Sequence, residues 1–129
     1  MVDRELLTYM RDASCKIVSF GIESGVQRIL DKISKRVTLD QIRKAVKLVN
    51  QVGLEPRGSF ILGLPTETLK DSLQTIYFAL RLPLKQAKFG LATPYPGTEL
   101  WNIALAEGQV KDVGEDWNRF TQMAAYTKF

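Results

Sequence analysis

Three segments of the sequence place glycine beside polar side chains, as ligand-binding loops often do. They span residues 21–25, 58–67 and 92–98. Each follows an apolar run and leads into a stretch with helical periodicity. Glycine lets the backbone approach a ligand closely, and the free N–H groups at the start of a helix attract polar or negative groups. These segments are therefore the candidate binding loops of the chain.

Among the residues of these loops, Glu23 is the strongest candidate for binding a ligand. It lies between two glycines at the expected end of a strand. A carboxylate there could bind an ammonium group or sugar hydroxyls, or it could only compensate the dipole of the next helix. The residues by themselves support both interpretations equally. At 63–67 and 94–98 they favour structural turns that start helices.

The composition restricts the chemistry further. The 129 residues contain no His and a single Cys, so we expect no catalytic base of that kind and no metal site within the chain. That residue, Cys15, is interpreted as a small buried hydrophobe. The net charge of +4 is spread along the chain, which does not indicate a nucleic-acid partner. The lone thiol and the lack of a long apolar run predict a cytoplasmic chain with no membrane partner.

Strands and helices that would position the loops alternate along the sequence. Branched and aromatic residues predict strands at 16–22, 54–63 and 87–93. Apolar periodicity and capping residues predict helices at 3–13, from 24, from 38, from 66 or 68, and at 98–107. Two pairs have the spacing of capping boxes: Ser24 with Gln27, and Thr38 with Gln41. The helix before Pro83 is expected to bury an apolar stripe of Leu69, Leu73, Ile76, Tyr77 and Leu80.

This order predicts an α/β fold with a parallel sheet, because strands that alternate with helices form βα units. Three strands leave both edge strands without a partner, and a helix precedes the first strand. These features are typical of half of a larger βα barrel. In such folds ligands bind at the C-terminal ends of the strands, where the three candidate loops lie.

Taken together, the segments resemble a known family. The stretches SFGIESG-VQRILDKI, T-LDQI-KAV, G-FILGLP-ET and TPYPGTEL, in this order, look like the later part of a radical S-adenosylmethionine (radical SAM) enzyme. The branch that they resemble has a MiaB/NifB-type core and often carries a cobalamin-binding domain. The resemblance implies that residues 1–108 supply strands four to six of a partial TIM-like (βα)6 barrel. Residues 109–129 would form a C-terminal extension that could act as a lid.

The resemblance also implies which residues bind S-adenosylmethionine (SAM). Glu23 would lie near its ribose and methionine parts, and Ser19 and Ser24 are lesser candidates. Ile61, on the next strand, would flank the adenine ring.

The two later loops contribute the remaining implied residues. Gly63 belongs to the same motif as Ile61, and Glu67 would support that loop. Pro94 and Tyr95 would contact the adenine from the loop after the sixth strand.

Two motifs of the family are missing from this sequence. Neither the CxxxCxxC motif, which holds a 4Fe-4S cluster, nor the glycine–glycine–glutamate motif, which holds the methionine amino group, occurs in it. Thr66 also stands where the family usually has glycine. We therefore expect the cluster ligands outside this chain, and the chain alone to be inactive. Its parent would be a radical SAM iron–sulfur enzyme acting on a small molecule, with cobalamin as a further candidate cofactor.

Other functions and partners remain open from the residues. The alternatives are a stand-alone nucleotide-binding α/β module and an RNA-associated piece of a tRNA-modifying enzyme. Arg57 would favour an anionic substrate if it points into the barrel, and would face water if it only marks the start of its strand. Half a barrel would also expose two edges and a concave apolar face lined by Val18, Phe20, Phe60, Leu62, Phe89 or their alternating neighbours. We expect a second copy of the chain to cover that surface in a homodimer.

Overall fold

The computed structural model describes residues 2–106, which form three strands and five helices. The strands are β1 (Ile17–Glu23), β2 (Glu55–Leu62) and β3 (Gln86–Leu91). The helices are α1 (Arg4–Asp12), α2 (Gln27–Lys32), α3 (Leu39–Gln51), α4 (Leu69–Arg81) and α5 (Glu99–Ala106). The predicted extension at 109–129 lies outside the described residues. None of the described helices is long and apolar enough to cross a bilayer.

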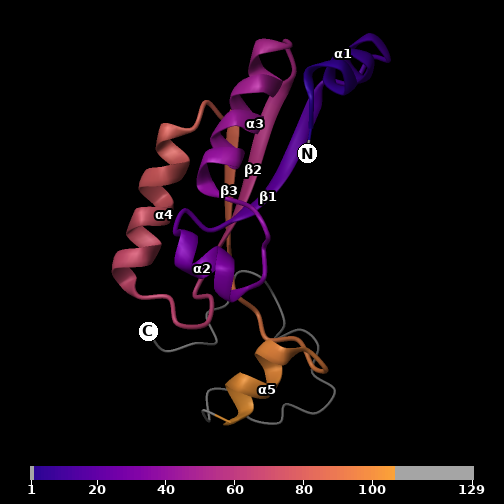
Figure 1. Cartoon of the computed structure of the whole chain (residues 1–129). Helices are drawn as coiled ribbons and strands as arrows, with labels where there is room; N and C mark the ends of the chain where they lie inside the picture. The colour runs from indigo at the N-terminus through magenta and orange to yellow at the C-terminus, as the bar shows by residue number, and fades with distance from the viewer. Residues whose placement is uncertain (1, 107–129) are drawn as a thin grey trace.

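The strands form one parallel sheet in the order β1-β2-β3, which confirms the predicted α/β class. Arg57 of the central strand lies opposite Ser19 of β1 and Gln86 of β3. Within the described residues the sheet is open, with β1 and β3 at its edges. All three strands end on the side where the chain continues into α2, α4 and α5 (Figure 1). The predicted loops therefore leave the sheet at one end.

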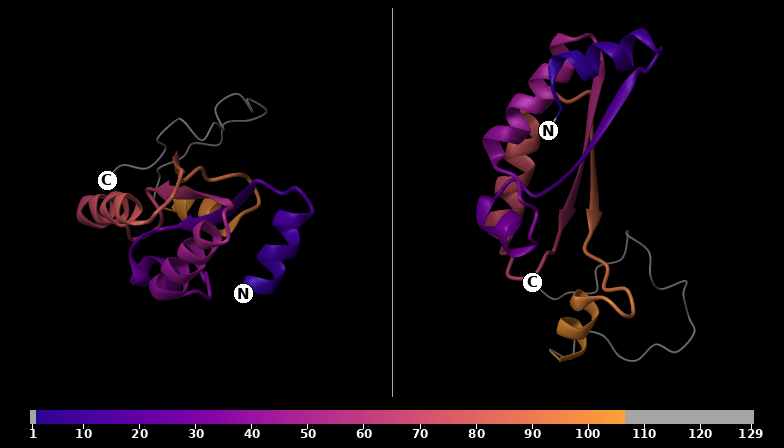
Figure 2. Two further views of the ribbon diagram at one scale, coloured as in Figure 1. Left: turned by 90° about the horizontal axis from the view of Figure 1, so that it is seen from above. Right: turned by 45° about the vertical axis from the view of Figure 1, so that its right-hand side comes forward.

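Helices α2, α3 and α4 lie on one face of the sheet, and none of the described helices covers the opposite face (Figure 2). The core between the sheet and these helices is apolar. Its buried side chains include Ile22, Leu30, Val46, Phe60 and Phe78. A second apolar cluster joins α1 to α3 and includes Leu7 and Val49. Burial on the helix side therefore holds the sheet against its helices, and within residues 2–106 no helix covers the other face.

Side-chain caps fix the starts of the two long helices. The Thr38 hydroxyl accepts from the Gln41 backbone at 3.2 Å, and the Gln41 side chain accepts from the Thr38 backbone at 2.8 Å. This capping box is confirmed. Thr68 forms the equivalent pair with Asp71 at the start of α4. At its end α3 stops at Gly53, whose φ of 86° is the left-handed conformation that glycine adopts freely.

The capping box predicted at Ser24 and Gln27 is wrong. Helix α2 begins at Gln27 with no side-chain cap. The Ser24 hydroxyl instead shares a buried hydrogen bond of 3.2 Å with the hydroxyl of Thr75 in α4. The same Thr75 oxygen accepts from the Gly25 backbone at 3.0 Å. A Cβ added to Gly25 would lie 2.8 Å from the Thr75 Cα, so α4 and the β1–α2 loop are in direct backbone contact.

The predicted buried face of α4 is also wrong. Four members of the apolar stripe are 49–75% exposed: Leu69, Leu73, Tyr77 and Leu80. The buried face consists of Ser72, Thr75, Phe78 and Ala79. Small side chains on that face allow the close approach to Gly25, and their hydroxyls are hydrogen-bonded. Close packing therefore decides the orientation of the helix over its apolar periodicity.

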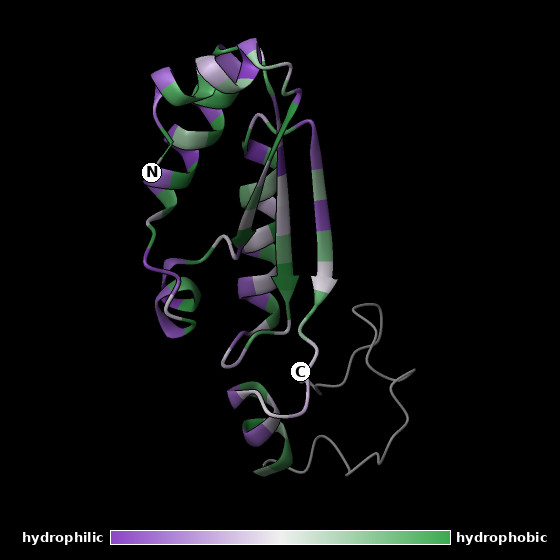
Figure 3. Ribbon diagram, turned by 90° about the vertical axis from the view of Figure 1, so that its right-hand side faces the viewer, coloured by the Kyte–Doolittle hydropathy of each residue, from purple (hydrophilic) through white to green (hydrophobic). Residues whose placement is uncertain are grey.

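The two faces of the sheet differ in chemistry. Val18, Phe20 and Phe60 pack into the clusters beneath the helices, and Phe89 stacks on Phe60 with ring centroids 5.1 Å apart. The uncovered face carries the alternate positions, among them Ser19, Arg57, Ser59, Gln86 and Lys88. Figure 3 looks onto this side of the sheet, where hydrophilic and hydrophobic residues alternate along β3. The predicted apolar concave face is therefore wrong, because the uncovered face is mostly polar; the homodimer stays a prediction.

Thr75→Val should destabilise the fold, because the isosteric change removes the only side-chain acceptor that the structure gives the buried Gly25 N–H. We expect a loss of about 1–3 kcal/mol in the free energy of unfolding, the usual cost of a buried donor left without a partner. Urea unfolding measures it. Thr8→Val is the control: Thr8 is partly buried in α1, its hydroxyl donates only to the Arg4 carbonyl of the same helix, and the change should cost less than about 0.5 kcal/mol. Equal losses in the two variants would contradict the assigned role of Thr75.

Asp71 makes the stability of the α4 start depend on pH. Thr68 donates to its carboxylate from both side chain and backbone and Arg28 lies 2.7 Å away, which holds the pKa of Asp71 below its ordinary value of 3.8. A carboxyl with a lowered folded-state pKa stabilises the fold above its unfolded pKa and loses this contribution as the pH falls through the folded pKa. We expect the stability difference between wild type and Asp71→Asn to shrink as the pH falls below 3.8. Unfolding measured across acidic pH checks this, and a constant difference would refute it.

Candidate functional site

Glu23 ends β1 at an irregularity that points its carboxylate across the end of the sheet. The register of β1 on β2 shifts between Gly21 and Glu23, and Glu23 has a φ of 69°, in the left-handed region. Its Oε1 accepts a hydrogen bond of 3.0 Å from Lys35 Nζ, in the loop between α2 and α3. The carboxylate is about a fifth exposed, at 21%. Its second oxygen has no hydrogen bond within residues 2–106 and remains able to accept one.

A cavity of about 490 Å³ lies beside Glu23 on the uncovered side of the sheet. Its lining includes Ser59 and Ile61 of β2 and Lys88 and Gly90 of β3. The volume is within the range of small-molecule sites. The structure therefore brings together two of the predicted binding residues, Glu23 and Ile61, from different strands.

Glu67 is bound within its own loop. One carboxylate oxygen accepts from the Leu64 backbone at 2.8 Å and the other accepts from the Ser72 hydroxyl at 2.9 Å. Gly63, at the end of β2, has a φ of 79° and is buried. These contacts tie the loop to the first turn of α4.

Arg28 of α2 holds the outer side of the same loop. Its guanidinium donates to the Thr66 carbonyl at 3.3 Å and to the Thr66 hydroxyl at 3.1 Å, and it pairs with Asp71. Thr66 has a φ of 67°, the conformation for which the family usually has glycine at this place. The hydroxyl and carbonyl contacts to Arg28 offset the strain of this backbone.

The two serine candidates lie away from the Glu23 cavity. Ser24 is fully buried, and its hydroxyl is committed to Thr75 on the helix side. Ser19 is on the uncovered face but nearer the start of β1, where it lines a second cavity with Arg57. Ser24 therefore helps to hold the backbone that follows Glu23, and Ser19 lies at a different part of the sheet.

The loop after β3 places its two candidates apart from that cavity. Pro94 is buried and Tyr95 is 39% exposed, and neither lines the 490 Å³ cavity. The Tyr95 carbonyl accepts from the Thr98 hydroxyl at 2.7 Å, and that hydroxyl caps α5 by accepting from Trp101 N at 3.1 Å. The predicted cap at Thr98 is therefore confirmed.

Lys35 and Lys88 are the site residues that sequence reasoning missed. Lys35 belongs to a basic run whose residues carry no sign of a specific partner, and only the fold shows its contact with Glu23. Lys88 could have been found from strand alternation once β2 and β3 were paired. Cys15 lies before β1, at the opposite end of the sheet, where its thiol donates to the Ile17 carbonyl at 3.4 Å. It is therefore not part of the site.

Comparisons with known proteins show to which family the chain belongs. Residues 1–79 match the family model of the radical SAM superfamily. The chain is 43% identical over 112 residues to an uncharacterized methyltransferase of Pyrococcus horikoshii, which is 87% of this chain and 24% of the relative. A putative methylthiotransferase of Methanocaldococcus jannaschii is 35% identical over 105 residues, 81% of this chain and 23% of the relative. Cytidylyl-2-hydroxyethylphosphonate methyltransferase of Streptomyces wedmorensis is 31% identical over 127 residues, 93% of this chain and 24% of the relative.

The chain spans about a quarter of the length of these curated relatives. The family match covers more than half of the chain and includes β1, β2 and most of α4. The relatives extend the similarity through β3. This chain belongs to the radical SAM superfamily.

Proposed function

We propose that this chain forms the SAM-binding side of a radical SAM enzyme that transfers a methyl or methylthio group. The observation that carries the proposal is the meeting of Glu23 and Ile61 at one cavity beyond the ends of β1 and β2. The relatives supply the reaction class, because their names describe methyltransferases and a methylthiotransferase. The chain's own residues then bind and orient SAM and exclude water from it.

Glu23 is the proposed ribose-binding residue. Lys35 holds one of its carboxylate oxygens, which leaves the other for a sugar hydroxyl. A carboxylate accepts hydrogen bonds from hydroxyls more strongly than a neutral group does. Ile61 would lie against the adenine, and Glu67 keeps the intervening loop in place through Leu64 and Ser72.

Pro94 and Tyr95 are assigned the adenine edge from the loop after β3. Tyr95 is partly exposed, in the loop that follows the end of β3. Its carbonyl already serves Thr98, so the ring is the part that would meet the base. The iron–sulfur ligands are assigned to other parts of the protein, because this sequence has one Cys and no His.

SAM bound to a reduced 4Fe-4S cluster supplies hydrogen-abstraction chemistry in this proposal. Cobalamin is proposed as an additional cofactor of the whole protein, and the cobalt content of the full-length enzyme tests it. A stand-alone nucleotide module is less well supported, because the family match and the relatives point to an enzyme. An RNA-associated piece of a tRNA-modifying enzyme is less well supported because the net charge of +4 is spread along the chain.

Glu23→Gln in the full-length protein should weaken SAM binding by about tenfold or more, because a hydrogen bond to a charged group contributes about 1.5–3 kcal/mol. Titration calorimetry with SAM measures the affinity. Glu67→Gln should have a smaller effect, because its contacts stay within the loop. Glu5→Gln, on α1 at the opposite end of the sheet, is the matched control. Wild-type affinity in the Glu23 variant would leave that carboxylate only a role towards the α2 dipole.

The 129-residue chain alone should not cleave SAM, because it lacks a ligand set for an iron–sulfur cluster. The test reconstitutes the purified chain with iron and sulfide, adds a strong reductant and assays for 5′-deoxyadenosine. The full-length protein under the same conditions is the positive control. Turnover by the short chain would overturn the assignment of the cluster to another part of the protein.

A further inference from the structure

A second cavity, of about 200 Å³, lies on the uncovered face of the sheet next to the 490 Å³ cavity beside Glu23, which is the proposed SAM site and is called the SAM cavity below. All three strands contribute polar side chains to its lining: Ser19 of β1, Arg57 and Ser59 of β2, and Gln86 and Lys88 of β3. The register explains the grouping, because Arg57 lies opposite both Ser19 and Gln86 and Ser59 lies opposite Lys88. Side chains at such positions point to the same face and lie near one another.

Arg57 is held there with a donor unused. Its Nε is buried and has no hydrogen-bond partner within the described residues. Its only ion pair in that part of the chain is a long one, 3.5 Å from Nη2 to Glu55 Oε2, and Glu55 is half exposed. The Arg57 side chain as a whole is 39% exposed, so its terminal N–H groups are open to the cavity, and the weak pairing with Glu55 leaves them able to donate to a ligand there.

Lys88 adds a second cation to the same cavity. It makes no hydrogen bond or ion pair with any residue of 2–106, and it lines both the second cavity and the SAM cavity. The charge nearby is not balanced: Glu55 opposes one of the two cations, while Glu23 is already paired with Lys35. The second cavity therefore keeps a net positive charge and offers hydroxyl and amide donors beside it.

We propose that Arg57 and Lys88 form an anion site that binds an oxyanion group of the substrate: a phosphate, a phosphonate or a carboxylate. Arginine donates to such groups in a planar fork, and lysine adds a point charge. Ser59 and Lys88 line both cavities, so a substrate anchored at Arg57 extends directly towards the SAM cavity. This assignment of a substrate class rests on the proposed function.

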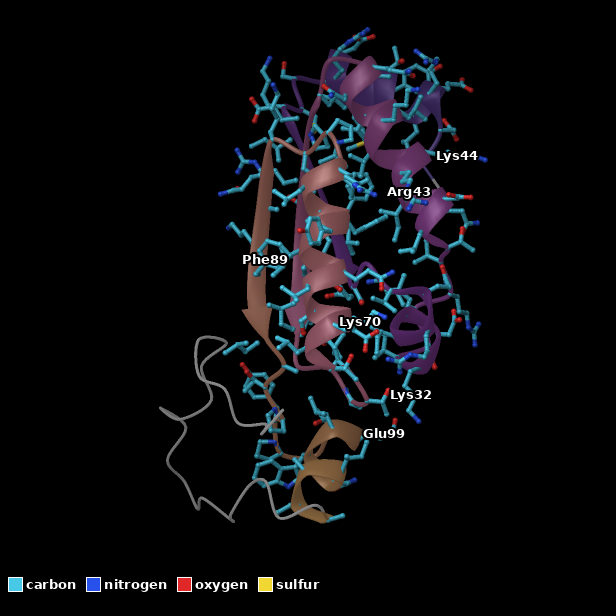
Figure 4. All side chains as sticks on the ribbon, turned by 90° about the vertical axis from the view of Figure 1, so that its left-hand side faces the viewer. Lys32, Arg43, Lys44, Lys70, Phe89 and Glu99 are labelled. Atoms are coloured by element: carbon cyan, nitrogen blue, oxygen red, sulfur yellow. The ribbon has the colours of Figure 1, made fainter. Side chains whose placement is uncertain are left out.

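The test is titration calorimetry of the full-length protein with SAM present. Inorganic phosphate is the titrant in one experiment and acetate in another. We expect at least one anion to bind, with its Kd raised about tenfold or more by Arg57→Gln and by Lys88→Gln, because each change removes a charged donor. Arg57→Lys, which keeps the charge, should lose less. Lys44→Gln changes net charge equally and is the control, since Lys44 projects from α3 on the helix-covered side (Figure 4). Tighter phosphate binding assigns a phosphate or phosphonate, and tighter acetate binding assigns a carboxylate.

SAM affinity measured on the same samples separates the two hypotheses. In the Arg57→Gln variant it should stay within twofold of wild type, because Arg57 does not line the SAM cavity, and thermal unfolding checks that the variants are folded. Anion binding that depends on Arg57 in a protein that does not bind SAM would support the anion site and reject the proposed function. Normal SAM binding with no anion binding, or with equal anion affinities in the Arg57→Gln and Lys44→Gln variants, would overturn the anion site.

Discussion

The hydroxyl of Thr75 holds the β1–α2 loop against α4, and the position of Glu23 depends on it. Two groups of the loop, the Gly25 N–H and the Ser24 hydroxyl, converge on this one buried oxygen. Both residues follow Glu23 directly, so the contact fixes the backbone from which the carboxylate projects. It also requires glycine at position 25, because a Cβ there would meet the Thr75 backbone at 2.8 Å. A contact on the helix side of the sheet thereby sets the geometry of the opposite side.

The same contact explains why α4 buries two hydroxyl side chains and leaves an apolar stripe on its outer face. Ser72 and Thr75 are small enough for the loop to approach, and Ser72 then reaches Glu67 to close the next loop. Side chains of this one helix therefore hold two of the candidate loops in place. The outward stripe of Leu69, Leu73, Tyr77 and Leu80 is left exposed in the described part of the chain. Nothing in residues 2–106 covers it, in contrast to the sheet face, whose exposed side chains are mostly polar.

Periodicity and capping signals predicted the strands, their parallel order and most helix starts, because these features depend on residues near in sequence. That Glu23 and Ile61 line one cavity could be predicted in the same way, since strand ends are local features. The buried face of α4 could not be predicted from the sequence. Hydrophobic periodicity carries no information about a close backbone contact between residues 50 positions apart, such as Gly25 and Thr75. The partnership of Lys35 with Glu23 and the grouping of Arg57 with Lys88 likewise depend on the tertiary fold and the strand register.

The left-handed backbone at Glu23 has a consequence for how this loop can evolve. A side chain with a Cβ is disfavoured at a φ of 69° by an energy on the order of 1–3 kcal/mol, so glycine would make the loop more stable. Glycine would also delete the carboxylate that faces the cavity. Under the proposed function, backbone stability and ligand binding therefore favour different residues at position 23. Glu23→Gly would relieve backbone strain and at the same time remove the proposed ligand contact.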